Sequence, residues 1–392
     1  MATYRRLPVH FVRGEGVWLW DQENRRYLDA LSGIAVCGLG HAHPAITEVL
    51  CDQAKTLLHT SNLYEIPQQV ALGQALTELA DMDRVFFGNS GAEANEAAIK
   101  IARRYGHERG IEQPAILVME NSFHGRTLAT LSATGNRRVR AGFEPLVPGF
   151  VRVPFDDLDA VDRAAANRPE IVAILVEPIQ GEGGVQIPAP DYLAELRRRC
   201  DAQGWLLMLD EIQTGMGRTG RLFAHEHAGI RPDVMTLAKG LGNGVPIGAC
   251  LARGPAAEVL GPGTHGSTFG GNPLVCRVAL KVLECLQQDV LWERADALGR
   301  RLLDQFQDTL GHLSGVRAIR GQGLMIGIEL DRPAGALVER ALERGLLINV
   351  TAERVVRLLP PLILQEEEAD RLVEQLAALL TDFLSVTGEE GP

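Results

Sequence analysis

Short apolar runs alternate with amphipathic stretches through the middle of the chain, from about residue 84 to residue 252. Seven of these runs predict strands, at 85–87, 115–119, 151–154, 171–176, 205–209, 234–237 and 247–251. Helical periodicity lies between several of them, most clearly at 92–104 and 192–203. Because buried parallel strands are almost continuously apolar, this pattern predicts an α/β fold whose mainly parallel, seven-stranded sheet is covered on both faces.

The two ends of the chain carry a different pattern. Residues 17–28 resemble a small hairpin whose turn is the polar run 21–24, and residues 273–310 look like one or two long helices. Further strands are predicted at 316–330 and 354–359. We therefore expect a large domain over residues 46–275 and a small α+β domain that residues 1–45 and 276–392 build together.

Composition excludes several classes of function. The chain has 392 residues, 46% of them hydrophobic, and a net charge of −11, which argues against binding to nucleic acid or to an anionic membrane surface. Its six cysteines show no Cys-x-x-Cys spacing, so neither a disulfide framework nor a structural metal site is expected. No segment approaches the roughly 18 apolar residues of a membrane span. We expect a cytoplasmic protein with no bound metal.

The strongest chemical signal is a lysine and a carboxylate at the ends of two predicted strands. Lys239 is one of only four lysines, and it lies in a Gly-containing loop directly after an apolar run. Asp210 follows the run 205–209, and Gln213 stands three positions later. A carboxylate at a strand end can be no more than a polar boundary, but open parallel sheets bind ligands there. An amine for an aldehyde, a carboxylate for a ring nitrogen and an amide for a ring oxygen suit pyridoxal phosphate.

The same cofactor needs a seat for its phosphate. Residues 87–96 run from a strand through small residues into a helix, which places free backbone N–H groups at Gly91 and Ala92. Taken alone, the segment is at least as consistent with an ordinary helix cap, in which Glu93 completes a capping box. It gains weight only beside Asp210 and Lys239.

Two further loops carry groups suited to a substrate or a cofactor. Phe123 and Arg126 supply an aromatic face and a guanidinium able to bind a carboxylate through two hydrogen bonds. The loop 264–273 is rich in glycine and hydroxyl groups, including Ser267 and Thr268. In isolation, either loop is explained as a simple connection.

Taken together, these motifs resemble the class III aminotransferases of fold type I, which depend on pyridoxal 5′-phosphate, and most of all the acetylornithine aminotransferases. The resemblance extends over nearly the whole chain. The segments that carry it are 32–36, 40–44, 89–96, 123–126, 177–184, 210–213, 238–239 and 267–273.

The resemblance implies a role for each matching residue. Lys239 attaches the cofactor covalently and later moves protons, Asp210 pairs with the ring nitrogen, and Gln213 with the ring oxygen. Phe123 stacks on the ring. The phosphate is held by Gly91 and Ala92 of one subunit and by Thr268 of its neighbour, which makes a homodimer with shared active sites the catalytic unit. The residues expected to contact substrate are Arg126, Ser267, Glu182 and Arg357.

Glu182 and Arg357 correspond to a carboxylate switch in this family. A donor that reacts through its terminal amine brings no carboxylate near Arg357, so the arginine pairs with Glu182. Glutamate does bring a carboxylate and displaces Glu182. Arg126 serves the far carboxylate of both substrates, because the two poses differ by a single methylene.

Other classes of protein fit less well. The run 215–220 matches Gly-x-Gly-x-x-Gly, the fingerprint of nicotinamide-dependent oxidoreductases, but it does not turn directly from a strand into a helix. The run 225–227, His-Glu-His, is a weak metal motif better explained as a loop. A non-catalytic binding protein on this fold is expected to lack some of Lys239, Asp210 and Phe123, and all are present.

Within the family, the predicted reaction transfers the terminal amine of N2-acetyl-L-ornithine to 2-oxoglutarate by a ping-pong mechanism, a step of arginine biosynthesis. Ornithine aminotransferases tend to carry an aromatic residue near the stretch 32–36, where this chain has small and aliphatic residues that leave room for an acyl group. Ornithine, succinyldiaminopimelate, carrier-bound lysine and 4-aminobutyrate stay open as alternative donors.

Overall fold

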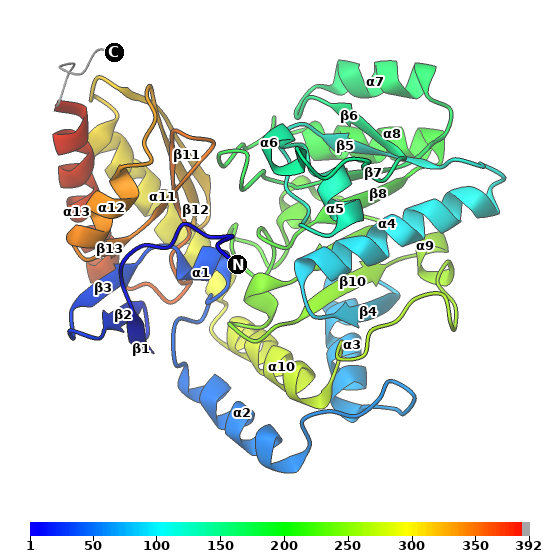
Figure 1. Ribbon diagram of the computed structural model, residues 1–392, viewed down its shortest axis with the longest axis horizontal. Helices are drawn as coiled ribbons and strands as arrows, with labels where there is room; N and C mark the ends of the chain where they lie inside the picture. The colour runs from blue at the N-terminus through cyan, green and yellow to red at the C-terminus, as the bar shows by residue number, and fades with distance from the viewer. Residues whose placement is uncertain (386–392) are drawn as a thin grey trace.

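A computed structural model describes residues 1–385 of the chain, so residues 386–392 of the predicted small domain lie outside the described part. The molecule has two lobes (Figure 1). One lobe contains the long central sheet, and the other combines the N-terminal strands with the C-terminal helices. The division at residues 45 and 275 stays a prediction.

The large lobe is built on the predicted seven-stranded sheet, with the order β4-β10-β9-β8-β7-β5-β6. Strand β10 is antiparallel to both neighbours, and the other pairs are parallel. Each apolar run predicted as a strand is confirmed to within about one residue. The strands are β4 (Arg84–Gly88), β5 (Ala115–Met119), β6 (Phe150–Val153), β7 (Ile171–Val176), β8 (Leu206–Asp210), β9 (Val234–Leu237) and β10 (Gly248–Ala252).

Helices cover both faces of this sheet, as the apolar strands require. In β5, Ile116 and Val118 pack against α4 (Gly91–Glu108), while Leu117 and Met119 face α7 (Leu158–Asn167) and α8 (Tyr192–Gln203) on the opposite side. All five residues of β5 are buried, because alternate side chains of a strand enter two different cores.

The small lobe contains two four-stranded sheets, β1-β2-β3-β13 and β11-β12-β15-β14. The parallel pair β3 and β13 joins the two ends of the chain in one sheet. The sequence pattern missed β1, whose side chains are mostly exposed on both faces, and the very short β13 and β14. The strands are β1 (Phe11–Glu15), β2 (Trp18–Asp21), β3 (Arg26–Asp29), β11 (Val316–Gln322), β12 (Met325–Leu330), β13 (Leu346–Leu347), β14 (Asn349–Thr351) and β15 (Val355–Leu358).

A single large apolar cluster runs from the small lobe through α10 into the helices beside β4. None of the described helices is long and apolar enough to span a membrane. The remaining helical elements are α1 (Ser32–Ala35), α2 (Pro44–Thr56), α3 (Pro67–Ala80), α5 (Leu128–Ala133), α6 (Arg137–Arg140), η1 (Ala224–Ala228), η2 (Lys239–Leu241), α9 (Pro255–Glu258), α10 (Pro273–Gln288), α11 (Leu291–Leu310), α12 (Leu337–Glu343) and α13 (Glu366–Ser385).

Candidate active site

A cavity of about 400 Å³ lies at the carboxyl ends of the parallel strands, where open α/β sheets bind ligands. Loops after β5, β7, β8 and β9 converge on it, together with the N-terminus of α4. Most residues singled out from the sequence line this cavity, namely Gly91, Ala92, Phe123, Arg126, Glu182, Asp210, Gln213 and Lys239.

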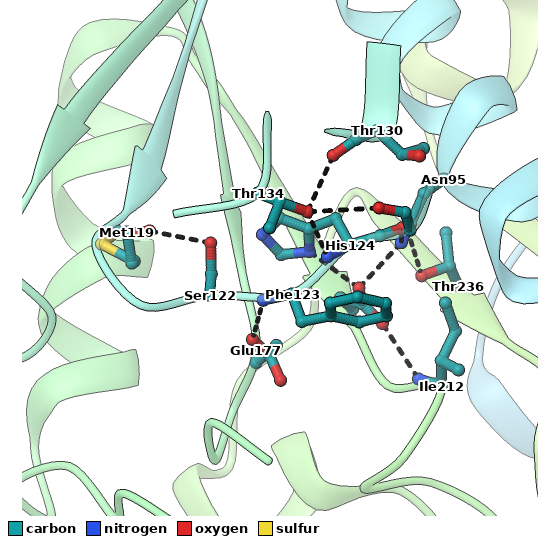
Figure 2. A network of polar contacts seen from close by, with 12 residues as sticks. Asn95, Met119, Ser122, Phe123, His124, Thr130, Thr134, Glu177, Ile212 and Thr236 are labelled. Atoms are coloured by element: carbon teal, nitrogen blue, oxygen red, sulfur yellow. Dashed lines mark hydrogen bonds and ion pairs between the residues drawn. The ribbon is translucent and has the colours of Figure 1, made fainter. Parts of the chain in front are cut away.

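Asp210 ends strand β8 and is held by three donors. Its Oδ2 accepts hydrogen bonds from Asn95 Nδ2 and from His124 Nδ1, each at 2.8 Å, and its Oδ1 accepts one from the backbone N–H of Ile212 at 3.2 Å. Asp210 and His124 are both buried. Figure 2 shows the donor residues Asn95, His124 and Ile212 around the Phe123 ring. A carboxylate bound in this way has one orientation relative to the cavity.

Asn95 connects this carboxylate to the next strand. The Thr236 hydroxyl, on β9, donates to Asn95 Oδ1 at 2.8 Å, and Asn95 Nδ2 also bonds the backbone carbonyl of His124 (Figure 2). Helix α4, strand β9 and the loop after β5 therefore meet at Asp210. The sequence motifs contained Asn95 and His124, but no local pattern indicates that they bond to an aspartate so distant in the chain.

Glu177 is a second buried carboxyl group on the cavity wall, directly after β7. It accepts the backbone N–H of Phe123 at 2.9 Å (Figure 2) and that of Gly181 at 3.1 Å. Burial raises the pKa of Glu177 to about 7, with Asp210 adding to the effect. The sequence reasoning gave this residue no role, although buried carboxyls with raised pKa values concentrate at active sites.

Lys239 follows β9 in a strained backbone conformation, with φ of 43°. Burial and the neighbouring Arg357 cation lower the pKa of its amine. A lysine whose amine is desolvated loses its proton more readily and becomes a better nucleophile. Of the residues on the cavity wall, Lys239 is therefore the one suited to bond an aldehyde.

The N-terminus of α4 opens toward the same cavity at Gly91 and Ala92. Ser90 caps the helix by accepting the N–H of Glu93 at 3.2 Å, and Glu93 accepts the N–H of Asn89 at 2.7 Å. The helix cap is thus present without the complete capping box, in which Glu93 would accept the N–H of Ser90 and not that of Asn89. The cap does not use the N–H groups of Gly91 and Ala92. The same segment can therefore cap the helix and bind an anion.

Arg357 lies on β15 of the small lobe and is completely buried. Its Nη1 lies 2.8 Å from Glu182 Oε1 and 3.4 Å from Gln213 Oε1, and its Nε donates to Asn349 Oδ1 at 3.2 Å. Nη2 has no hydrogen-bond partner within residues 1–385. The structure thus brings Glu182 and Arg357 together at the boundary between the lobes.

The remaining predicted residues lie around this site. Arg126 is exposed at the mouth of the cavity, with its guanidinium 5.6 Å from the centroid of the Phe123 ring. Ser267 does not line the cavity, but its hydroxyl lies 3.3 Å from Asn89 Nδ2. Thr268 is exposed and lies outside the cavity of its own chain.

The two motifs set aside in the sequence have other partners. His225 pairs with the buried Glu211 at 2.9 Å, and His227 contacts the Thr219 carbonyl at 2.9 Å. The run 215–220 forms turns against the small lobe and opens no helix.

Comparisons with known proteins agree with this geometry. Residues 1–380 match the family described as Aminotransferase class-III. An acetylornithine aminotransferase from Nitrosomonas europaea is 61% identical over 98% of both chains.

Among solved structures, the ornithine aminotransferase of Toxoplasma gondii superposes with a TM-score of 0.95 at 36% identity, covering 98% of this chain and 93% of that one. The acetylornithine aminotransferase of Elizabethkingia anophelis gives 0.88 at 36% identity, covering 98% and 96%. The chain belongs to the class III aminotransferases.

Proposed function

We propose that this enzyme transfers the terminal amine of N2-acetyl-L-ornithine to 2-oxoglutarate with pyridoxal 5′-phosphate, as a cytoplasmic homodimer serving arginine biosynthesis. The observation that carries the proposal is that groups suited to a cofactor and groups suited to a substrate carboxylate meet at one cavity. Lys239, Asp210 and the N-terminus of α4 offer groups for an aldehyde, a ring nitrogen and a phosphate. Arg357 with Glu182 offers a carboxylate site that can be closed or open.

The residues present fit pyridoxal phosphate. The Lys239 amine, with its lowered pKa, suits covalent attachment, and the Asp210 carboxylate is an acceptor for a protonated ring nitrogen. Glycine at position 91 lets the Ile212 side chain pack against the helix N-terminus, since an added Cβ there would lie 2.7 Å from that side chain. The free N–H groups at this terminus suit a phosphate. When bound, the cofactor supplies an aldehyde for the amine and a ring that withdraws electrons.

In the proposed reaction, the protein residues bind, orient and move protons. Lys239 is the base that removes a proton from the carbon bearing the amine and later returns it. Asp210, fixed by Asn95 and His124, keeps the ring nitrogen protonated. Phe123 covers one ring face. Arg126 at the mouth of the cavity receives the far carboxylate of either substrate.

The donor is the finer part of the proposal, and two observations favour acetylornithine over ornithine. The chain is more similar to the Nitrosomonas enzyme, at 61% identity, than to the Toxoplasma ornithine enzyme, at 36%. Val36, an aliphatic residue, forms part of the cavity wall. Val36 directly follows α1, whose residues all have positive φ. Its side chain carries no hydroxyl group that could recognise a free α-amine.

A panel of donors tests this choice. N-acetylornithine, ornithine, succinyldiaminopimelate and 4-aminobutyrate are compared by kcat/KM with 2-oxoglutarate as the acceptor. We expect N-acetylornithine to be preferred over ornithine by at least roughly tenfold, because a free ammonium would have to be desolvated against an apolar wall. Equal or higher kcat/KM with ornithine would contradict the assignment.

The homodimer is supported by an exposed apolar surface beside the loop that carries Thr268. Asn62 donates to the carbonyls of Ser267 and Gly270, each at 3.0 Å, which places segments 57–64 and 264–272 side by side. Apolar side chains stand out from both segments, namely Leu57, Leu58, Leu63, Tyr64 and Phe269. Contiguous exposed apolar groups of this kind mark protein interfaces.

Subunit mixing tests whether Thr268 serves the neighbouring site. We expect Lys239→Ala and Thr268→Ala homodimers each to be inactive or nearly so, and subunits are exchanged between them. In the mixed dimer, one of the two sites has both wild-type residues, so activity should recover. No recovery after verified exchange would show that Thr268 does not act across the interface.

A further inference from the structure

The run 215–220, Gly-Met-Gly-Arg-Thr-Gly, forms a tight joint between the two lobes. It begins two residues after Gln213 and packs against the turn between β11 and β12. The N–H of Leu324 donates to the Arg218 carbonyl at 2.9 Å. A Cβ on Gly323 would lie 2.6 Å from the same carbonyl oxygen, so only glycine lets the two backbones approach this closely.

Arg218 is almost completely buried in this joint, at 3% exposure. Burial lowers the pKa of its guanidinium to about 9, and no carboxylate lies within ion-pair distance in residues 1–385. Its Nη1 donates instead to two carbonyls, Leu324 O at 3.0 Å and Pro360 O at 2.5 Å. A buried cation without a counter-charge is costly, and an apolar residue would fill the space more cheaply. An apolar residue, however, could not donate the two hydrogen bonds that Arg218 makes to these carbonyls.

Both carbonyls flank the strands that carry the carboxylate site. Leu324 immediately precedes β12, and Pro360 follows β15 by two residues. The two strands pair with Gly327 opposite Arg357. Because the two strands are antiparallel, Leu324 and Pro360 lie at the same end of the pair, the end near Arg357, and Arg218 bonds both carbonyls there. It does so from the loop that contains Gln213, whose amide oxygen lies 3.4 Å from Arg357 Nη1.

We propose that Arg218 is a positioning residue for the carboxylate site: through the carbonyls of Leu324 and Pro360 it fixes β15, and with it Arg357, against Gln213 and Glu182. This inference rests on the proposed function, because it presumes that a substrate carboxylate binds Arg357. It gives a structural task to the glycine-rich motif. Lysine at position 218 would keep the charge but lose the planar guanidinium, which fixes the directions of the two N–H bonds that Nη1 donates to these carbonyls.

A double-mutant cycle on the holoenzyme tests the proposal. The probe is glutarate, a dicarboxylate that resembles 2-oxoglutarate but cannot react, and calorimetry gives its dissociation constant for wild type, Arg218→Met, Arg357→Ala and the double variant. We expect Arg218→Met to weaken glutarate binding by roughly tenfold, the size of one hydrogen bond to a charged group. In the Arg357→Ala background the same change should matter by less than about twofold.

The outcomes separate the inference from the proposed function. Equal weakening in both backgrounds, or none in the wild type, overturns the positioning role while the proposed function stands. If Arg357→Ala alone leaves glutarate affinity unchanged, the part of the proposed function that assigns the carboxylate site to Arg357 fails, and the positioning role fails with it. Arg197→Met is a matched control, since Arg197 pairs with Asp233 inside the large lobe, and it should alter thermal stability without altering glutarate affinity. If Arg218→Met does not fold, Arg218→Lys replaces it in the cycle with the same expectation.

Discussion

The two ends of the active-site cavity are built in opposite ways. At Asp210, three donors from neighbouring segments of one lobe satisfy a carboxylate that is 4% exposed. At Arg357, a fully buried guanidinium crosses between lobes to Glu182, whose side chain is 38% exposed, and one of its nitrogens has no partner within residues 1–385.

Asp210 is therefore held in one arrangement, whereas Arg357 can exchange one carboxylate partner for another. We call the surroundings of Asp210 the fixed end of the cavity and those of Arg357 the exchangeable end. A carboxylate held by three donors on a packed sheet keeps one geometry throughout the reaction, as a cofactor anchor must, and has acceptor capacity left for the ring nitrogen. A buried cation held by a partly hydrated carboxylate can change partners, because Glu182 can return to water while Arg357 cannot. Substitutions at the first end should damage both half-reactions equally, whereas substitutions at the second should damage them unequally.

The largest effect is expected from Lys239→Ala, which removes both the covalent attachment and the proton-transferring base. We expect turnover to fall by at least roughly 10⁴-fold with either substrate. The visible absorption of the lysine-bound cofactor should disappear, while the thermal unfolding temperature of the apoprotein stays close to that of the wild type. Persistent absorption with borohydride trapping on Lys55, Lys100 or Lys281 would identify another attachment site.

Asp210→Asn keeps the shape of the fixed end and removes its charge. Loss of a preorganised charge in a buried site costs about 10²–10³ in rate, and we expect that loss in both half-reactions. Single-turnover spectra with glutamate and with acetylornithine measure each separately. A loss confined to one donor would mean that Asp210 contributes to substrate choice, contrary to the comparison.

Glu177→Gln sharpens the description of the fixed end through stability. Burial raises the pKa of Glu177 from 4.5 to about 7. Between these pH values the folded state keeps the proton on Glu177, whereas the unfolded chain has already released it. Wild-type stability from this group is therefore complete at low pH and is lost as pH rises from about 4.5 to 7, a difference of about 3 kcal/mol. The Gln variant lacks this dependence, so its unfolding temperature relative to wild type should rise across that window. A constant difference would show that Glu177 is ionised throughout.

At the exchangeable end, Glu182→Gln should have the smallest effect and the opposite sign for the two substrates. A neutral amide holds Arg357 more weakly, so binding of 2-oxoglutarate should improve. Because the Glu182 side chain is 38% exposed, its pairing with the buried Arg357 is weakened by solvent and contributes about 1 kcal/mol, so discrimination between acetylornithine and glutamate should fall by no more than roughly tenfold. The ratio of kcat/KM values for the two half-reactions gives the result, and an unchanged ratio would remove Glu182 from the switch.

The fixed end was more accessible to sequence analysis than the exchangeable one. Buried parallel strands such as Ile171–Val176 are continuously apolar, so their positions and the placement of Asp210 at a strand end could be read directly. The bonds that hold Asp210 could not, because His124 lies 86 positions away and its neighbours give no periodic signal. The exposed edge strand β1 escaped notice for a related reason, since neither of its faces is buried.

The pairing of Glu182 with Arg357 came only from resemblance to a family. The two residues lie on different lobes, and their meeting depends on how β15 docks against the loop after β7, which the Gly-Met-Gly-Arg-Thr-Gly joint helps to fix. That motif matches the fingerprint of a nucleotide site, but its sequence context argued against such a site. Its structural task follows from the hydrogen bonds of Arg218 to the carbonyls of Leu324 and Pro360, which are distant in the chain and give no local sequence signal.

The most direct test of the exchangeable end is the pair of half-reactions of Arg357→Ala, each followed by single-turnover spectra. Losing a desolvated carboxylate contact costs about 2–5 kcal/mol, or roughly one and a half to three and a half decades in kcat/KM. The account predicts that loss with glutamate and a much smaller one with acetylornithine, while Arg126→Ala damages both. Equal losses in the two half-reactions for Arg357→Ala would contradict the switch and leave Arg357 as a structural cation.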